Sequence, residues 1–308
     1  MVQGSLGDRY GIGRTCAKMS PLLLTGLGVI VAWKAGMFNI GGEGQYVMGG
    51  LTGAWLAKIL MIHNIDGADL LIAILIASII GGGLYGLLAG WMKTSRGVDV
   101  VISTILLNFV AIQVLKWAVA GPLMEAQGGL PQTDELPASA MLWKPDPRTD
   151  LHAGILIGII CAILVWLFLY RTKRGFQLRV VGDNPLVART NRVPVSRIQL
   201  LAMAISGALC GLAGGVEYTA IAGQVGTDFS QNWGFLGIPV AIIAGLHPLL
   251  ILLSAFYFGA MIAGSVNLER FSTYGDTLIY VVQAAAVLGL VALQSIKTKR
   301  KIVAEVNE

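Results

Sequence analysis

Apolar runs about 20 residues long recur along the chain, and they constrain its fold more than any other feature. A helix of that length crosses the roughly 30 Å hydrocarbon core of a bilayer at about 1.5 Å per residue. Only 13% of the 308 residues are charged, against about 25% in average soluble domains. Because backbone groups in lipid must pair internally, the sequence predicts an all-α polytopic membrane protein with a single transmembrane domain over residues 1–308.

The apolar runs predict about nine membrane spans. The run at 233–246 is short and is joined to its successor by Leu246, His247 and Pro248, which is typical of half-helices or a tight hairpin. An odd number of spans leaves the basic segment 1–20 outside, so we expect that a preceding helix is missing or that the first span inserts atypically. The expected spans are 21–37, 43–62, 69–92, 98–120, 151–170, 198–222, 233–246, 248–267 and 276–295.

Lysine and arginine residues alternate unevenly between the two sides of the membrane. The positive-inside rule places the richer side, with the loop 171–197, in the cytoplasm. The loop 121–150 then lies outside. It carries a cluster of acidic residues: Glu125, Asp134, Glu135, Asp146 and Asp150.

The cytoplasmic loop 171–197 contains the signals of a short capped helix. Asp183 or Asn184 can cap free N–H groups, and a proline is favoured at the first helical position. We therefore expect a helix over Pro185–Thr190, closed by Asn191 in the left-handed conformation. Two interpretations remain open. The segment is a basic membrane anchor, or it is a docking helix for a cytoplasmic partner.

A second distinctive stretch, Asn39–Gln45, places three glycines and several polar side chains in an otherwise apolar region. Polar groups at this depth need partners or a cavity. Glu43 falls in a first helical turn, where the helix dipole favours an acid. The sequence therefore allows simple capping, or a role of Asn39, Glu43 and Gln45 in lining or gating a pathway.

The span at 98–120 carries Ser103, Thr104 and Asn108. Thr104 and Asn108 are four residues apart and share a helix face, and Asn108 falls near the bilayer midplane. Its partner is either another helix or a polar solute in a pathway. Two glycine trios, Gly82/Gly86/Gly90 and Gly207/Gly211/Gly215, predict close helix packing, either within the chain or between subunits.

Several function classes lack their residues in this sequence. There is no phosphate-binding G-x-x-x-x-G-K-[ST] motif, no H-E-x-x-H and no G-x-S-x-G. The three cysteines lack metal-ligand spacing. We therefore expect no catalytic residues, metal or cofactor. The net charge of +5 lies beside membrane segments and does not indicate nucleic-acid binding. A pore driven by a separate ATPase fits these observations.

Four stretches of this sequence resemble the permease family of ABC importers for simple sugars, nucleosides and branched-chain amino acids. The first two look most like the nucleoside branch, which is the basic-membrane-protein type. The resemblance covers nearly the whole chain. The four stretches are 21–28 with 35–45, 97–108, 178–189 and 205–215.

This resemblance implies a type II-like importer subunit in a bacterial cytoplasmic membrane, with a first helix that this sequence lacks. The implied partners are membrane lipid, a second permease in a heterodimer, a tandem-domain ATPase that uses the ATP, and an extracellular nucleoside-binding lipoprotein. The implied coupling residues are Arg179, Gly182, Asp183, Asn184, Pro185, Ala188 and Arg189. The candidate pathway residues are Asn39, Glu43, Gln45, Ser103, Thr104 and Asn108.

Three alternatives remain open at this stage. The chain is a permease for sugars of the ribose or galactose type or for branched-chain amino acids, or it is a secondary carrier or facilitator that needs no ATPase. A membrane enzyme would need a catalytic cluster that the sequence does not contain. Stacking on a nucleobase would need aromatic side chains such as Phe109 or Trp233.

Overall fold

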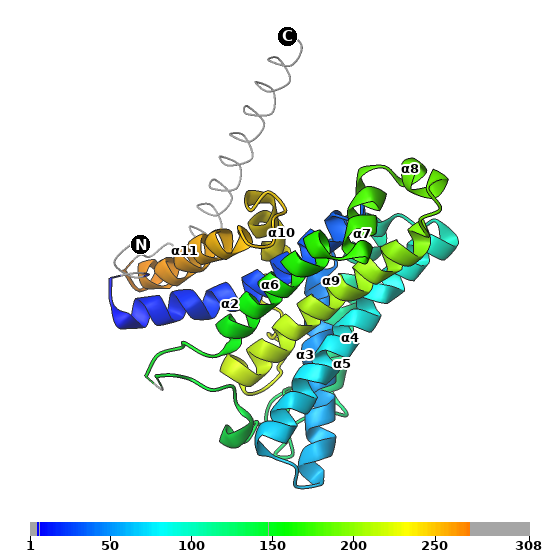
Figure 1. Ribbon diagram of the computed structural model, residues 1–308. Helices are drawn as coiled ribbons and strands as arrows, with labels where there is room; N and C mark the ends of the chain where they lie inside the picture. Colours follow the sequence, from blue (N-terminus) through cyan, green and yellow to red (C-terminus); the bar gives the residue numbers. More distant parts are fainter. Residues whose placement is uncertain (1–4, 6, 147, 272–308) are drawn as a thin grey trace.

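The computed structural model describes residue 5, residues 7–146 and residues 148–271. Within these ranges the chain is helical and forms no strand beyond an isolated bridge between Gln132 and Gly226. The predicted all-α class is therefore confirmed (Figure 1). The long helices are α2 (Arg9–Trp33), α3 (Gly42–Ile62), α4 (Gly67–Arg96), α5 (Val100–Ala120), α6 (Gly154–Arg171), α9 (Val195–Glu217) and α11 (Ile251–Phe271). The shorter elements are η1 (Ala138–Ala140), α7 (Lys173–Asp183), α8 (Pro185–Thr190), the π-helical turn η2 (Tyr218–Ala222) and α10 (Trp233–Ile243).

Five of the described helices are long and apolar enough to cross a membrane: α2, α4, α5, α6 and α9 with its π-helical extension. The protein is thus a multi-pass membrane protein, while the number of about nine spans remains a prediction. The expected span 276–295 lies outside the described residues. The first expected span, 21–37, begins earlier than predicted, because Asp8 accepts a hydrogen bond from the Gly11 amide and caps α2 at Arg9.

Glycine packing joins the two helices at the centre of the bundle. Helix α4 packs against α9 more extensively than any other described pair. A Cβ atom on Gly207 would collide with the Gly82 carbonyl oxygen, and one on Gly211 would collide with the Ser78 carbonyl oxygen. The glycine trios therefore serve packing within the chain, where small residues let two backbones approach closely.

Helix α10 is a half-helix that starts inside the bundle. It packs against α2, α3 and α11. The Thr25 hydroxyl of α2 donates to the Trp233 carbonyl oxygen at 3.1 Å. The chain turns after α10 through Gly245 and Leu246, both in the left-handed region with φ of +61° and +53°. This turn confirms that the short apolar run 233–246 does not continue directly into its successor.

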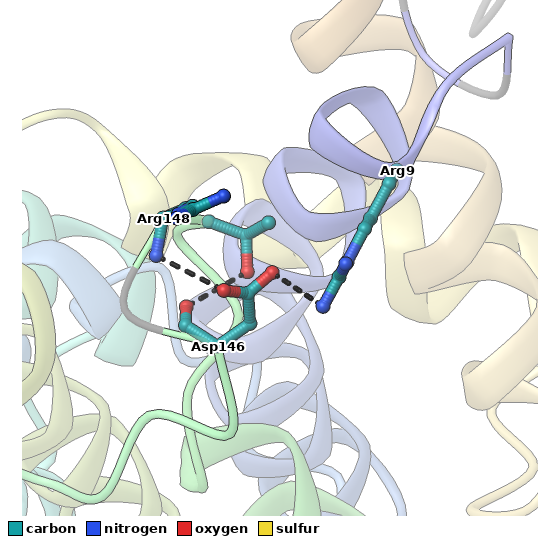
Figure 2. Close-up of polar contacts among 4 residues, drawn as sticks. Arg9, Asp146 and Arg148 are labelled. Atoms are coloured by element: carbon teal, nitrogen blue, oxygen red, sulfur yellow. Dashed lines mark hydrogen bonds and ion pairs between the residues drawn. The ribbon is translucent and has the colours of Figure 1, made fainter.

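The two ends of the bundle differ in character (Figure 1). Helices α7 and α8 lie at one end, and the 121–150 segment lies toward the other. Asp146 of that segment forms an ion pair with Arg9 at the start of α2, with 2.9 Å between Oδ2 and Nη2 (Figure 2). The Arg148 amide donates to the same carboxylate at 3.2 Å. The 121–150 segment is thereby attached to the first turn of α2.

Candidate functional site

The chain between α2 and α3 breaks at Asn39, and side-chain hydrogen bonds hold the break. The Asn39 amide donates to Gln45 Oε1 and to the Ser206 hydroxyl of α9, both at 2.9 Å. Its oxygen accepts from the Gly41 backbone amide at 2.8 Å. Asn39 and Gln45 are both 1% exposed. Two of the candidate pathway residues thus fix the shape of the break and its contact with α9.

The polar stripe of α5 completes this network from the other side. The Asn108 side-chain oxygen accepts from the Gly44 amide at 2.8 Å, and its nitrogen donates to the Ile40 carbonyl oxygen at 3.0 Å. The Thr104 hydroxyl accepts from the Ile40 amide at 3.3 Å. The Ser103 hydroxyl instead bonds within its own helix. The shared face of Thr104 and Asn108 therefore contacts the break and the start of α3. Of the two partners considered for Asn108, another helix or a polar solute, the structure shows the first.

Glu43 joins the starts of two helices. Its carboxylate accepts from the Ser230 hydroxyl at 2.7 Å and from the backbone amides of Asn232 and Gly234 at 3.1 and 2.7 Å. Glu43 lies in the first turn of α3 and also faces the N-terminus of α10. Both helix dipoles present their positive ends to this carboxylate. Glu43 thus caps a helix that begins 190 residues further along the chain, a contact that local sequence rules do not reveal.

The six candidate pathway residues are buried, and the exposed face of α5 lies elsewhere. A groove on that face is lined by Phe109, Val110, Gln113, Val114 and Trp117. Phe109 and Trp117 are each 63% exposed within the chain. Trp233, the other aromatic residue considered from the sequence, is 3% exposed and packs inside the bundle. Sequence reasoning missed Gln113 and Trp117 because they follow ordinary helical spacing on an apolar span.

At the basic end of the bundle, α8 covers Pro185–Thr190 as predicted from its cap. Asn184 provides the cap, since its side-chain oxygen accepts from the amides of Leu186 and Val187 at 3.0 and 3.1 Å. Asp183 instead ends α7. The left-handed residue is Arg192, with φ of +57°, and not Asn191, whose φ is −88°.

Arg192 takes the left-handed conformation in place of Asn191 for a local reason. The Asn191 side chain donates to the Val187 carbonyl oxygen at 2.9 Å and so satisfies one of the last carbonyl groups of α8. The Arg192 and Val193 amides donate to the Arg189 and Ala188 carbonyl oxygens, each at 2.9 Å. This pattern closes the helix one residue later than the sequence predicted.

Helix α7 was not predicted from the sequence. It lies between α6 and α8 in the chain and contacts α6, α8 and α9. Its strongly basic composition favoured a loop, but Thr172 caps the helix by accepting from the Gly175 amide at 3.0 Å. Gly182 lies against Lys34 and Gly36 after α2, so closely that a Cβ atom would collide with the Lys34 carbonyl oxygen. The α7–α8 segment therefore contacts the chain just before the Asn39 break.

Arg179 of α7 is half-buried and takes part in an aromatic stack. Its guanidinium carbon lies 4.8 Å from the ring centroid of Tyr170 in α6. Tyr170 in turn stacks on His247, with 5.7 Å between ring centroids. This stack connects α7 with the turn that follows α10. Sequence reasoning missed this stack, because the three residues are separated along the chain and no local motif relates them.

The exposed part of α8 is apolar and basic. Leu186 and Val187 are 70% and 48% exposed, and Arg189 is exposed beside them, while Ala188 is fully buried. Large apolar side chains exposed next to positive charge on a short structured element are typical of a protein contact surface. The seven candidate coupling residues therefore divide into two groups. Four of them are exposed and three pack against the chain, with Ala188 buried and Arg179 and Gly182 half-buried. The exposed four are Asp183, Asn184, Pro185 and Arg189.

At the opposite end of the bundle, two groups have shifted pKa values: Glu125 in the 121–150 segment and His152 just before α6. Burial lowers the pKa of His152 to about 4, and the charges of Lys144 and Lys18 contribute to this shift. The neutral ring accepts a hydrogen bond from the Gly154 amide at Nδ1, at 3.1 Å. Hydrogen bonds from Gln132 and from backbone amides lower the pKa of Glu125. Among the described residues, no group of three or more histidine, cysteine or acidic side chains could hold a metal ion.

Its long apolar helices make the chain a multi-pass membrane protein. Residues 11–291 match the family model described as branched-chain amino acid transport system / permease component. The chain belongs to this family and is a permease subunit of an ABC importer.

Three relatives extend over most of the chain. A guanosine ABC transporter permease of Bacillus subtilis is 30% identical over 96% of this chain and 84% of its own length. A nucleoside ABC transporter permease of Lactococcus lactis is 29% identical over 86% of this chain and 75% of its own length. A glucose ABC transporter permease of Haloferax volcanii is 26% identical over 96% and 80%. No solved structure matches the chain.

Proposed function

We propose that this permease subunit carries nucleosides across a bacterial cytoplasmic membrane. The observation that carries this substrate class is the 30% identity to a guanosine permease over 96% of the chain, together with the similarity to a second nucleoside permease. A sugar is the second candidate, because a glucose permease is similar over an equal share of the chain.

The groove on α5 supports the nucleoside assignment. A nucleoside pairs an aromatic base with polar ring atoms and a sugar. Phe109 and Trp117 offer exposed aromatic faces on which a base can stack. Gln113 lines the groove with them, and the groove surface is almost entirely apolar, so what it offers a nucleoside is stacking on the base. In this proposal the groove faces a second permease subunit across the translocation path, and the two subunits form a heterodimer.

The buried residues of the break then serve the pathway indirectly. Four of these side chains form hydrogen bonds within the chain and so hold α3, α5 and α9 in position relative to one another. They are Asn39, Gln45, Thr104 and Asn108. Glu43 fixes the start of α10. In our proposal this network positions the groove-bearing helix α5 relative to the half-helix α10.

Helix α8 is the proposed contact with a tandem-domain ATPase, which would use the ATP. The Asn184 cap keeps α8 helical although it has only six residues. Motion of α8 would reach the bundle through two contacts: Gly182 against Lys34, and the stack of Arg179 on Tyr170 and His247. The acidic 121–150 segment at the other end would meet the substrate-binding lipoprotein.

Uptake in cells tests the substrate class. A strain lacking the chromosomal gene for this chain should accumulate labelled guanosine more slowly than its parent, and the cloned gene should restore the rate. Excess unlabelled nucleoside should compete, whereas glucose and leucine should not. Normal guanosine uptake in the deletion strain, together with a loss of labelled glucose uptake that the cloned gene restores, would support the sugar assignment instead.

Cross-linking tests the coupling assignment separately. In a cysteine-free background, Leu186→Cys on α8 should form a cross-link with the ATPase in native membranes. Leu164→Cys on α6, which is also exposed at 56%, serves as the matched control and should form none. Equal cross-linking at both positions, or at neither, would contradict the assignment of α8.

A further inference from the structure

Helix α6 ends in a positive charge at the level where a bilayer ends. Its 18 residues correspond to a length of roughly 27 Å, which is close to the hydrocarbon thickness of a membrane. Helix α6 is also among the described helices that are long and apolar enough to cross a membrane. Its last residue, Arg171, therefore falls among the lipid headgroups.

The first turn of α7 lies at the same level, because it packs against the last turns of α6. A Cβ atom on Gly175 would collide with the Phe168 carbonyl oxygen and would lie 2.7 Å from the Cα atom of Leu169. The Thr172 hydroxyl accepts from the Gly175 amide at 3.0 Å and so holds this turn in place. The start of α7 is therefore kept beside the end of the membrane-crossing helix.

Three cations are gathered at this junction without a counterion. Arg171, Lys173 and Arg174 are exposed, and none of them forms an ion pair with a residue that the structure describes. The nearest acidic residue along the chain is Asp183, at the opposite end of α7. Positive charges clustered directly beside a membrane helix attract anionic lipid headgroups. The junction therefore has the charge that a membrane surface with anionic lipids would complement.

Two aromatic side chains accompany these cations. Trp166 of α6 lies beside Arg171, with 5.6 Å between its ring centroid and the guanidinium carbon. Phe176 of α7 is 59% exposed, and its ring centroid lies 5.9 Å from the guanidinium carbon of Arg179. Tryptophan is enriched where a membrane meets water. An exposed phenyl ring beside cations at that level favours the lipid interface over water as its surroundings.

We propose that the junction of α6 and α7 binds the headgroups of anionic phospholipids. The side chains of Arg171, Lys173 and Arg174 bind the headgroup phosphates, for which the two guanidinium groups offer paired donors. The ring of Phe176 enters the apolar part of the interface. The site thus combines charge with apolar burial, the two contributions that bind a peripheral segment to a membrane.

The two interpretations of the loop 171–197 then apply to different parts of it. The start of α7 is the membrane anchor. Helix α8, which lies further out at this end of the bundle (Figure 1), is left for a protein partner. Because α7 continues into α8 at Asn184, bound lipid fixes the position from which α8 projects. The inference requires only that α6 crosses the membrane and is independent of the transported substrate.

Native mass spectrometry of the purified full chain tests the proposal. The detergent solution would contain equal amounts of phosphatidylglycerol and phosphatidylcholine with the same acyl chains. The wild-type protein should retain the anionic lipid several-fold more than the zwitterionic one. The triple variant Arg171→Gln, Lys173→Gln and Arg174→Gln should lose most of this preference. Equal retention of both lipids by the wild type, or an unchanged preference in the triple variant, would overturn the proposal.

A second triple variant provides the matched control. Arg189→Gln, Arg192→Gln and Arg197→Gln remove the same charge from exposed residues of the same basic segment. This control should keep the preference for phosphatidylglycerol, because its cations lie on or after α8. A loss equal to that of the first triple variant would mean that only the total charge matters, and would overturn the assignment to the junction.

Phe176→Ser changes no charge and separates a lipid from a protein partner. It should lower the retention of phosphatidylglycerol and leave the amount of ATPase that co-purifies with the permease unchanged. Normal lipid retention with loss of the ATPase would assign this surface to a protein and overturn the proposal. If the first triple variant does not fold, Lys173→Gln decides alone. It should weaken the preference by up to about fivefold, and a wild-type preference in this variant would contradict the proposal.

Discussion

Replacing Glu43 by alanine should strongly destabilise the contact between α3 and α10. The carboxylate accepts three hydrogen bonds at 2.7, 3.1 and 2.7 Å. The Ser230 hydroxyl can rotate toward another acceptor, but the backbone amides of Asn232 and Gly234 cannot. A buried donor left without a partner costs about 1–3 kcal/mol, so two of them cost about 2–6 kcal/mol. Gly234 also packs against the backbone of Gly42 and Glu43, which limits the access of replacement water.

The measurement is thermal unfolding in detergent, followed by the loss of the monodisperse chromatographic peak. Glu43→Gln should be intermediate, because its amide keeps one acceptor oxygen and loses the charge that faces two helix N-termini. Glu135→Ala, at an exposed acid of the 121–150 segment, is the matched control and should stay close to the wild type. A Glu43→Ala variant that unfolds within the experimental error of Glu135→Ala would refute this account of the break.

Three further predictions concern other parts of the chain. Asn184→Ala should remove about 1 kcal/mol of capping, which is about a fivefold faster amide exchange at the start of α8, and should reduce transport per ATP hydrolysed. Gly207→Ala should destabilise the packing of α4 and α9 by about 1–3 kcal/mol, measured as a lower unfolding temperature. The lowered pKa of His152 means that the unfolded chain binds a proton that the folded chain does not between about pH 6.5 and 4. Stability should therefore fall by up to about 3 kcal/mol as the pH decreases through this window.

Matched variants make these three predictions decisive. Asp183→Ala changes an exposed residue that does not cap α8, so amide exchange at the start of α8 should stay normal in this control. Wild-type exchange in Asn184→Ala, or faster exchange in Asp183→Ala, would contradict the capping assignment. Gly83→Ala places a Cβ atom 3.4 Å from the Ala204 carbonyl oxygen and should be tolerated. Glutamine does not titrate, so His152→Gln should make the free energy of unfolding less dependent on pH between about pH 6.5 and 4. An unchanged slope in this variant would assign the acid sensitivity to other groups.

Local sequence rules predicted the parts of the fold that depend on neighbouring residues. A polar cap at Asp183 or Asn184, followed by Pro185 at the first helical position, was sufficient to place α8. The apolar runs located most long helices, because length and hydropathy decide whether a helix can span a membrane. The four-residue spacing of Thr104 and Asn108 correctly indicated a common helix face.

Contacts between distant segments could not be predicted in the same way. The Glu43 carboxylate is bound by residues that lie about 190 positions later, and the sequence offered only its own helix start as a partner. Helix α7 was missed because its basic residues resemble a loop, although Thr172 supplies a cap. The first turns of α2 were missed because Arg9 and Lys18 argued against a membrane helix. The structure gives Arg9 an ion pair with Asp146 and Lys18 an aromatic contact.

Transport by the purified complex tests the central claim most directly. The chain would be isolated from its native membrane with the proteins that remain bound in mild detergent, and the complex would be reconstituted into liposomes. The account predicts that labelled guanosine, delivered with the substrate-binding protein, accumulates only when ATP is available to the ATPase side. It also predicts that glucose does not accumulate. Accumulation of glucose in place of guanosine, or guanosine uptake that proceeds without ATP and without an associated ATPase, would contradict it.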